Sequence, residues 1–153
     1  MNSVFLKIDG VSGESKDAMH QGWIDADTWS WGTQHNDTQA GPGKSHFSNL
    51  VVHCRVDKAT AGLLLYSANG TKRRKVEISA CKAGDGQQEY YRITLENVMI
   101  TDVGLRDNGM QADVTYEFQG DRVKFQYWEQ ADAGGKAAET RMGWDIKNSS
   151  SCF

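Results

Sequence analysis

Cysteine and histidine are common metal ligands, and cysteine is also a catalytic nucleophile, so their spacing is a direct test for chemistry. The chain has three cysteines: Cys54, Cys81 and Cys152. They form neither a C-x-x-C redox pair nor a thiolate zinc site. There are four histidines: His20, His35, His46 and His53. None of them are spaced for a helical or strand metal site, so we predict no metal and no cofactor, and only a histidine site assembled by the fold stays open.

Motifs for nucleophilic catalysis and for phosphate binding are missing as well. There is no G-x-S-x-G nucleophile turn and no G-x-x-x-x-G-K-[ST] phosphate loop. The run Gly84-Asp85-Gly86 lacks the third glycine of a dinucleotide loop and is typical of a hairpin turn. Asp25 and Asp27 share one face of a predicted strand and are the acid pair that a hydrolase would need. Paired carboxylates of this kind are usually solvated or ion-paired, so we predict no catalytic residues and no enzyme.

Size and charge limit the classes of protein that remain. With 153 residues and 17.0 kDa, the chain matches one domain, and a compact fold of this mass exposes about 7,700 Å². A net charge of −3 gives no general attraction to nucleic acid or to anionic membranes. No apolar run approaches the length of a membrane span, and the charged N-terminal residues do not resemble a signal peptide. These features favour a soluble cytoplasmic domain.

A single basic run, Lys72-Arg73-Arg74-Lys75, follows Asn69-Gly70-Thr71. Short charge runs of this kind are usually solvated, so we interpret it as a turn that leads into a strand. A contact with phosphate or with a partner protein is the alternative.

Alternation of apolar and polar residues dominates the chain and predicts strands. The predicted strands cover residues 4–8, 23–32, 50–56, 76–80, 91–100, 114–118 and 123–127. Gly120-Asp121 predicts a tight turn that makes a hairpin of the last two. In the strand over 91–100 the apolar positions change from odd to even numbers, which predicts a bulge near Glu96-Asn97. One helix is predicted, capped by Asp57 and ended by Gly70. The pattern indicates a mainly β fold, either a β-barrel or a two-sheet sandwich.

The polar segment over 33–45 is long for a connection inside one domain and contains Pro42, the single proline, between Gly41 and Gly43. Loops of this length are usually functional or disordered. It is either a loop without a role or an arm that docks on another copy of the protein.

Four segments in a fixed order carry a family pattern. The first is D-G-V-S-G-E-S, with Asp9, Gly10, Gly13, Glu14 and Ser15. The second, Trp29-Ser30-Trp31-Gly32, follows Trp23-Ile24-Asp25, and the third is the strand from Tyr90 to Val98. The fourth contains Gly143 and Trp144 near the end of the chain. Together these segments resemble the Hcp (hemolysin-coregulated protein) family, the tail-tube proteins of type VI secretion, over nearly the whole chain.

The resemblance implies a compact β-barrel of two antiparallel sheets with one α-helix and one long extended loop, as a single domain over 1–153. It implies a structural protein rather than an enzyme: six copies form a ring, and rings stack into a hollow tube. The implied partners are other copies of the chain, the spike protein and the sheath of the machine, and small effectors in the ring lumen, with no nucleic acid and no membrane insertion. The implied location is the cytoplasm during assembly, followed by type VI export without a signal peptide.

Two surfaces are candidates for contacts between copies. The extended loop is the candidate for ring stacking, with Gln34, Gly41, Pro42, Gly43 and Lys44. The lateral candidates are Phe5 and Trp128, because each lies on the face opposite the core residues of its strand. The alternative is that the second sheet and the helix cover both rings within one subunit. A further alternative is a monomeric barrel that binds a small ligand or a carbohydrate on exposed tryptophans.

Overall fold

A computed structural model of the chain describes residues 2–36, 44–83, 88–132 and 134–153. The described part has one helix, α1 (Thr60–Asn69), and ten strands. The strands are β1 (Asn2–Ile8), β2 (Ile24–Ser30), β3 (Thr33–Asn36), β4 (Lys44–Phe47), β5 (Leu50–Arg55), β6 (Arg73–Lys82), β7 (Gln88–Asp107), β8 (Ala112–Gln130), β9 (Lys136–Asp145) and β10 (Ser150–Ser151).

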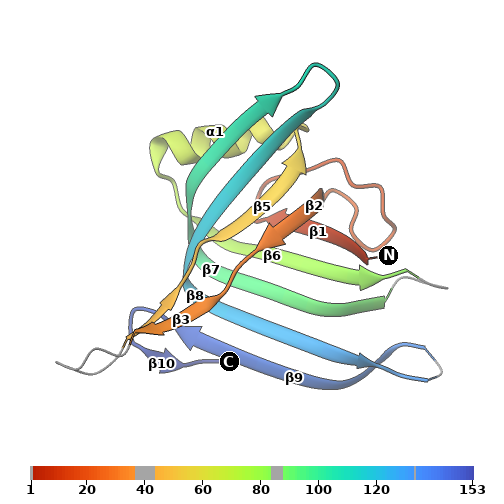
Figure 1. The fold of residues 1–153 in the computed structure, drawn as a ribbon, viewed down its shortest axis with the longest axis vertical. Helices are drawn as coiled ribbons and strands as arrows, with labels where there is room; N and C mark the ends of the chain where they lie inside the picture. Colours follow the sequence, from red (N-terminus) through yellow and green to blue (C-terminus); the bar gives the residue numbers. More distant parts are fainter. Residues whose placement is uncertain (1, 37–43, 84–87, 133) are drawn as a thin grey trace.

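The strands form two antiparallel sheets (Figure 1). The large sheet has the order β10-β9-β8-β5-β2-β1-β6-β7, and β7 also pairs with β8. This extra pairing closes the sheet into a barrel, while β9 and β10 continue from β8 outside the closed wall. The second sheet contains only β3 and β4. The predicted mainly β barrel is therefore confirmed.

The core consists of alternate residues of the barrel strands. Neighbouring strands place Leu6, Ile78 and Ile93 in one row, and all three are fully buried. Helix α1 packs against β7 and adds the buried Leu63. The period-two pattern of the sequence thus identifies the inner face of the barrel.

The predicted hairpin at Gly120-Asp121 is wrong, because β8 runs through these residues without interruption. A Cβ atom at Gly120 would lie 2.9 Å from the Cβ atom of Leu95, so glycine is needed here for close packing between strands. The turn that joins β7 to β8 contains Asn108 and Gly109, with Gly109 at a φ of 86°.

The predicted irregularity near Glu96-Asn97 is present, in a different form. Asn97 has a φ of 52°, and the buried positions change from odd to even numbers at this point. In the partner strand β8 the buried positions also change, from even to odd numbers, opposite Asn97. The pairing register between β7 and β8 is therefore the same before and after Asn97. The register shift between the two strands lies further along, between Ile100 and Asp102.

Helix α1 starts three residues after the predicted cap. The Asp57 carboxylate accepts a hydrogen bond from the backbone N–H of Ala59 at 2.9 Å, in the turn before the helix. Ala59 occupies the cap position and makes no side-chain capping bond. The predicted end is confirmed: Gly70 is left-handed, with a φ of 71°, and its N–H donates to the carbonyl of Tyr66.

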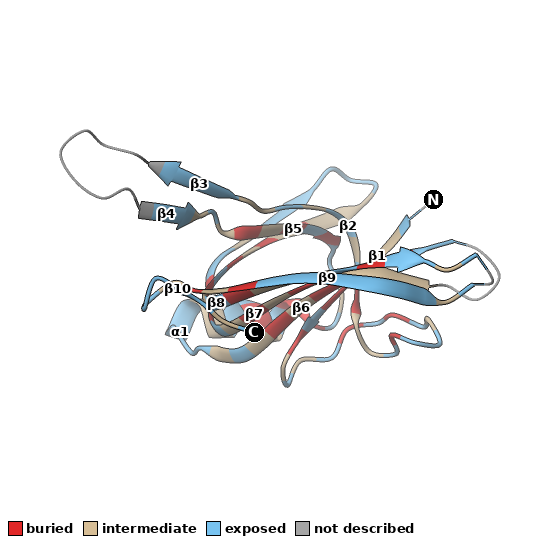
Figure 2. Cartoon of the chain, turned by 90° about the horizontal axis from the view of Figure 1, so that it is seen from below, coloured by how far each residue is buried: buried red, intermediate tan, exposed pale blue. Residues whose placement is uncertain are grey.

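The two ends of the predicted loop over 33–45 pair with each other. Thr33 lies opposite Phe47 and Asn36 opposite Lys44, which makes a two-stranded arm that projects from the barrel (Figure 2). Gly41, Pro42 and Gly43 lie outside the described residues. The chain exposes 9135 Å², about 1,400 Å² more than the value expected for a compact protein of this mass.

Candidate assembly surfaces

The segment that starts at Asp9 forms a tight backbone joint. The carbonyl oxygen of Asp9 accepts hydrogen bonds from Arg73 Nε and Nη2 at 3.1 and 2.8 Å. Gly10 follows with a φ of 78°, and a Cβ atom there would lie 2.6 Å from the guanidinium of Arg73. The guanidinium also lies 4.5 Å from the centre of the Tyr66 ring. Arg73 is therefore held by intramolecular contacts.

The next residues fold the loop over 9–23 back on itself. Gly13 N donates to the carbonyl of Gly22 at 2.7 Å, and Ser15 N donates to the carbonyl of Trp23 at 2.9 Å. Glu14 Oε2 accepts a hydrogen bond of 2.7 Å from the backbone N–H of Lys58, in the turn before α1. The signature residues thus shape this loop and connect it to the helix.

His20 connects the same loop to the sheet. Its ring is 5% exposed and stacks on Phe5, with 4.1 Å between ring centres. Nδ1 lies 2.7 Å from Asp17 Oδ2, and Nε2 lies 2.9 Å from the hydroxyl of Ser79. The Ser79 hydroxyl donates in turn to Glu89 Oε2 at 2.6 Å.

The order Asp17–His20–Ser79 is that of a hydrolase triad, and the spacing of residues in the sequence did not reveal it. His20 and Ser79 lie on distant segments. The pairing of β1 with β6 places Ser79 opposite Phe5, and His20 stacks on Phe5 from the loop over 9–23. Ser79 is fully buried, and its hydroxyl is used by Glu89. A nucleophile must reach its substrate, so this arrangement is a structural tie.

Glu89 is the centre of a charge cluster over the ends of β6, β7 and β9. Its carboxylate lies 2.8 Å from Arg92 Nε and 3.0 Å from Lys136 Nζ. Burial alone would raise the pKa of this carboxyl, but the hydrogen bonds from Ser79 and Lys136 and the charge of Arg92 together lower it. The cluster therefore stabilises the folded chain at neutral pH.

Both lateral candidates are covered by their own chain. Phe5 is 5% exposed beneath His20, and Trp128 is 8% exposed. Trp128 Nε1 donates to Glu139 at 2.9 Å, and Lys136 Nζ lies 3.7 Å from the ring centre. Both rings are thus covered within one subunit, as in the alternative prediction. The loop over 9–23 and β9 provide this cover, and the helix does not. A lateral contact through either ring stays an untested prediction.

The second family segment builds the base of the arm. Trp29 Nε1 donates to the hydroxyl of Tyr91 at 3.0 Å. Trp31 stacks on Phe47, with ring centres 5.7 Å apart. Gly32 N donates to the Ser48 hydroxyl at 3.0 Å, so the two strands of the arm leave the barrel together. Gln34 is exposed on β3, and Lys44 begins β4.

Gly143 and Trp144 join β9 to the end of the chain. Cys152 N donates to the carbonyl of Gly143 at 3.0 Å, and Ser151 pairs with Trp144. A Cβ atom at Gly143 would overlap the carbonyl of Cys152, so only glycine allows this approach. Trp144 is half-buried against the core.

All five tryptophans lie in the described part of the chain, and every one is buried or half-buried. The exposed stacking platforms expected for a carbohydrate-binding barrel are therefore not formed by these residues.

Asp25 and Asp27 line a surface hollow of about 370 Å³ with Glu14 and Asp57. Burial, followed by the charges of Glu14 and Asp25, raises the pKa of Asp57. Across 2–36, 44–83, 88–132 and 134–153, no three His, Cys, Asp or Glu side chains are placed to hold a metal ion. The nearby Cys54 thiol is buried, which raises its pKa to about 12 and leaves it a poor nucleophile.

Most residues of the basic run form ion pairs with acidic side chains of the same chain. Lys72 lies 3.8 Å from Asp121, Arg74 lies 3.4 Å from Asp9, and Lys75 lies 3.8 Å from Glu77. These pairings agree with a solvated turn that leads into β6. Among the described residues there is no helix with the length and apolar character of a membrane span.

Comparison with known proteins gives a consistent family assignment. The profile of the family described as "Type VI secretion system effector, Hcp" matches residues 5–130. Protein hcp1 of Pseudomonas aeruginosa is 31% identical, over 94% of each chain. The crystal structure of Hcp1 from Salmonella typhimurium superposes with a TM-score of 0.84 at 28% identity, over 99% of each chain.

A second solved structure supports the fold alone. It is described as a type six secretion system protein and superposes with a TM-score of 0.90 at 20% identity, over 99% of this chain and 100% of the other. The chain therefore belongs to the Hcp family of type VI secretion, whose members are structural tube proteins and not enzymes.

Proposed function

We propose that this chain, as a single domain over residues 1–153, assembles into six-membered rings that stack into a hollow tube. The observation that supports this most directly is the match to the Hcp family profile over residues 5–130. A standard protein interface hides about 800 Å² on each partner. A ring subunit has two lateral neighbours, so two standard contacts would hide about 1,600 Å² of the 9135 Å² that the single chain exposes.

The β3–β4 arm supports stacking. An isolated two-stranded ribbon is at best marginally stable in water, so a projecting one gains from docking on another surface. Its described side chains Gln34, His35, Ser45 and His46 are exposed and polar. Polar contacts suit a junction that forms and separates, and we assign the arm to the face between rings. Gln34, Gly41, Pro42, Gly43 and Lys44 are the proposed stacking residues.

The remaining parts of the proposal follow from the family. We assign the spike protein and the sheath of the secretion machine as partners of the tube, and small effector proteins as cargo in the ring lumen. Assembly takes place in the cytoplasm, and the chain then leaves the cell by the type VI route.

Particle mass and shape test this function. We expect light scattering after size exclusion to give about six times 17.0 kDa, and negative-stain images to show annular particles. A strict monomer at every concentration, without annular particles, would overturn the proposal.

A further inference from the structure

The chain contains two Asn-Gly pairs, and both are exposed. Asn69-Gly70 ends α1, and Asn108-Gly109 lies in the turn between β7 and β8. In such a pair the backbone nitrogen of glycine can attack the side-chain amide carbon of asparagine, because glycine has no Cβ atom to hinder the approach. The two pairs are chemically identical, so a difference in their reactivity must come from their surroundings.

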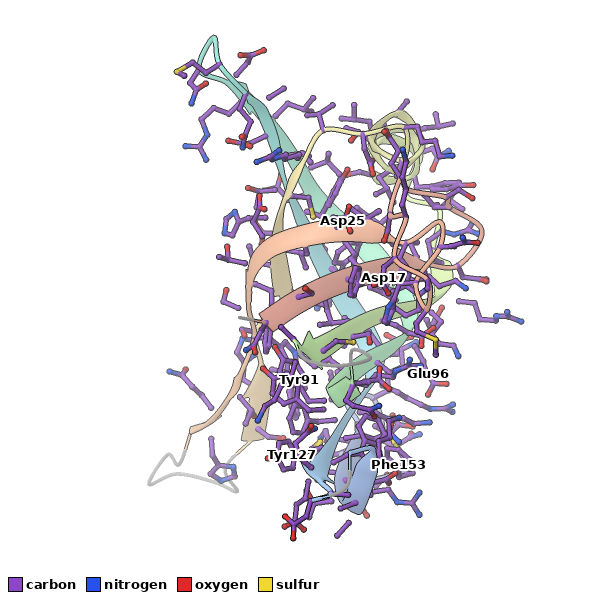
Figure 3. The ribbon with its side chains drawn as sticks, turned by 90° about the vertical axis from the view of Figure 1, so that its right-hand side faces the viewer. Asp17, Asp25, Tyr91, Glu96, Tyr127 and Phe153 are labelled. Atoms are coloured by element: carbon purple, nitrogen blue, oxygen red, sulfur yellow. The ribbon has the colours of Figure 1, made fainter. Side chains whose placement is uncertain are left out.

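The Asn108-Gly109 turn lies at the free end of the β7–β8 hairpin, which projects beyond the rest of the molecule (Figure 1 and Figure 3). Every residue from Gly104 to Met110 is exposed. The backbone N–H of Asn108 donates to the carbonyl of Gln111 at 3.3 Å and closes the turn. The turn is therefore ordered and open to water.

A carboxylate lies on the nitrogen that would attack. The backbone N–H of Gly109 donates to Asp107 Oδ1, with 2.7 Å between nitrogen and oxygen. A general base must lie within hydrogen-bond distance of the proton that it removes, and this carboxylate does. Among the described residues, no lysine, arginine or histidine forms an ion pair with Asp107, so the carboxylate is available to accept the proton.

Two donors hold the oxygen of the amide that would be attacked. Oδ1 of Asn108 accepts hydrogen bonds from the backbone N–H groups of Met110 and Gln111, each at 2.9 Å. Negative charge develops on this oxygen when a nitrogen adds to the amide carbon. Donors at about 2.7–3.1 Å from such an oxygen stabilise the transition state. The turn thus supplies both a base and an oxyanion site.

The second Asn-Gly pair lacks the base and one of the donors. The N–H of Gly70 donates to the backbone carbonyl of Tyr66, which is not a base at neutral pH. Oδ1 of Asn69 accepts one hydrogen bond, from the backbone N–H of Thr71 at 2.9 Å. Asn69-Gly70 is therefore an internal control for Asn108-Gly109.

We propose that Asn108 is a site of spontaneous covalent modification, at which the turn itself promotes conversion of asparagine into aspartate and isoaspartate. Gly109 N forms a bond to Asn108 Cγ, its proton passes to Asp107, and the electron pair of the C=O bond moves to Oδ1. This pair then returns, ammonia leaves with the proton from Asp107, and a cyclic imide remains. Water opens the imide at either carbonyl, so one amide and one water give one carboxylic acid and one ammonia.

The products change the charge and the path of the turn. Each conversion adds one negative charge to the net charge of −3, directly beside Asp107. In the isoaspartate product the main chain runs through Cβ and Cγ of residue 108. We expect the hydrogen bond that closes the turn, between residues 108 and 111, to be lost in that product.

Peptide mapping of the folded wild-type chain measures the reaction. Trypsin cleaves after Lys58, Lys72, Arg106 and Arg122, so the two Asn-Gly pairs fall in separate peptides. During incubation at neutral pH we expect the Asn108 peptide to gain the mass of an amide-to-acid conversion at least about tenfold faster than the Asn69 peptide. Equal conversion, or slower conversion at Asn108, would overturn the proposal. The reaction needs a single chain, so this result does not depend on ring assembly.

The variant Asp107→Asn tests the base. Its side-chain oxygen can still accept the N–H of Gly109, but an amide does not take up the proton. We expect conversion at Asn108, located by fragment sequencing, to slow by about tenfold or more. The matched control is Asp102→Asn, which removes an exposed carboxylate of the same strand and should leave the rate unchanged. Equal rates in the two variants would contradict the role of Asp107.

The pH profile gives a readout that a purely structural role of Asp107 would not change. Hydroxide is scarce at about pH 6, where we expect the largest ratio of the Asn108 rate to the Asn69 rate; towards about pH 9 hydroxide serves both pairs and the ratio falls. The other charged residues at this end of the hairpin, Arg106 and Asp113, lie opposite each other and are unchanged in Asp107→Asn. In that variant we expect a constant ratio. A constant ratio in wild type would overturn the proposal.

Discussion

Gly143 shows how a residue that identifies the family can act through the backbone alone. It lies where β9 meets the last residues of the chain, and its carbonyl accepts the hydrogen bond of Cys152 N at 3.0 Å. Gly10 and Gly13 are similar, because a Cβ atom at either would press on Arg73 or on the carbonyl of Trp23. These glycines are explained by close approach, without any chemistry at the site.

We expect Gly143→Ala to lower the free energy of unfolding by about 1–3 kcal/mol, the usual range for forcing extra atoms into a packed site. The added methyl group would overlap the carbonyl of Cys152 and force the segment from Ser150 to Phe153 away from β9. Denaturant unfolding measures the change. Gly104→Ala is the control, because a Cβ atom there meets nothing within 4 Å. Equal stability of the two variants would show that the close approach is unimportant.

The Glu89 cluster predicts acid sensitivity. The folded pKa of this carboxyl is lower than its ordinary value of 4.5, so its stabilising contribution is present above about pH 4.5 and is lost as the pH falls through the folded pKa. We expect Glu89→Gln to be less stable than wild type by about 1–2 kcal/mol at pH 7. Between pH 6 and pH 3 this variant loses less stability than wild type.

Thermal unfolding at several pH values measures this difference. Glu129→Gln is the control, because Glu129 is an exposed carboxylate on the same sheet. The assignment fails if Glu89→Gln and wild type lose the same stability on acidification.

At the scale of elements, alternation predicted the strands of the barrel wall, because one face of β1, β2, β5, β6, β7 and β8 enters the core. Alternation alone could not decide the structure at Gly120, because a glycine between two apolar runs fits both a turn and a close contact between strands. Only the packing against Leu95 decides between these interpretations. The helix end at Gly70 was predictable because a left-handed terminal glycine is a local feature.

The arm predicts a separation between ring formation and stacking. Deletion of Gly41-Pro42-Gly43 shortens the arm without removing any described residue of the barrel. We expect the rings to persist in light scattering, and the stacked particles in electron micrographs to become fewer and shorter. If the rings themselves dissociate, the arm belongs to the lateral contact and its assignment to stacking is wrong.

At the scale of the whole molecule, the sequence could not show which surfaces the chain covers by itself. Phe5 has large apolar neighbours on both faces of its strand, which predicted a contact with another subunit. The structure places His20, from a loop whose path is set by non-local pairing with Ser79, over that ring. For the same reason the exposure of Tyr127 was not predicted: Phe125 and Tyr127 both show core parity, yet Tyr127 is 36% exposed.

Assembly into rings, as proposed, makes the stability of the chain depend on its concentration. If neighbouring subunits hide surface that the single chain exposes, association stabilises the folded state by mass action. We expect the melting temperature of wild type to rise by several degrees when the concentration increases from about 1 to 100 μM. A wild-type melting temperature that is independent of concentration would mean that the exposed surface is not hidden by other copies.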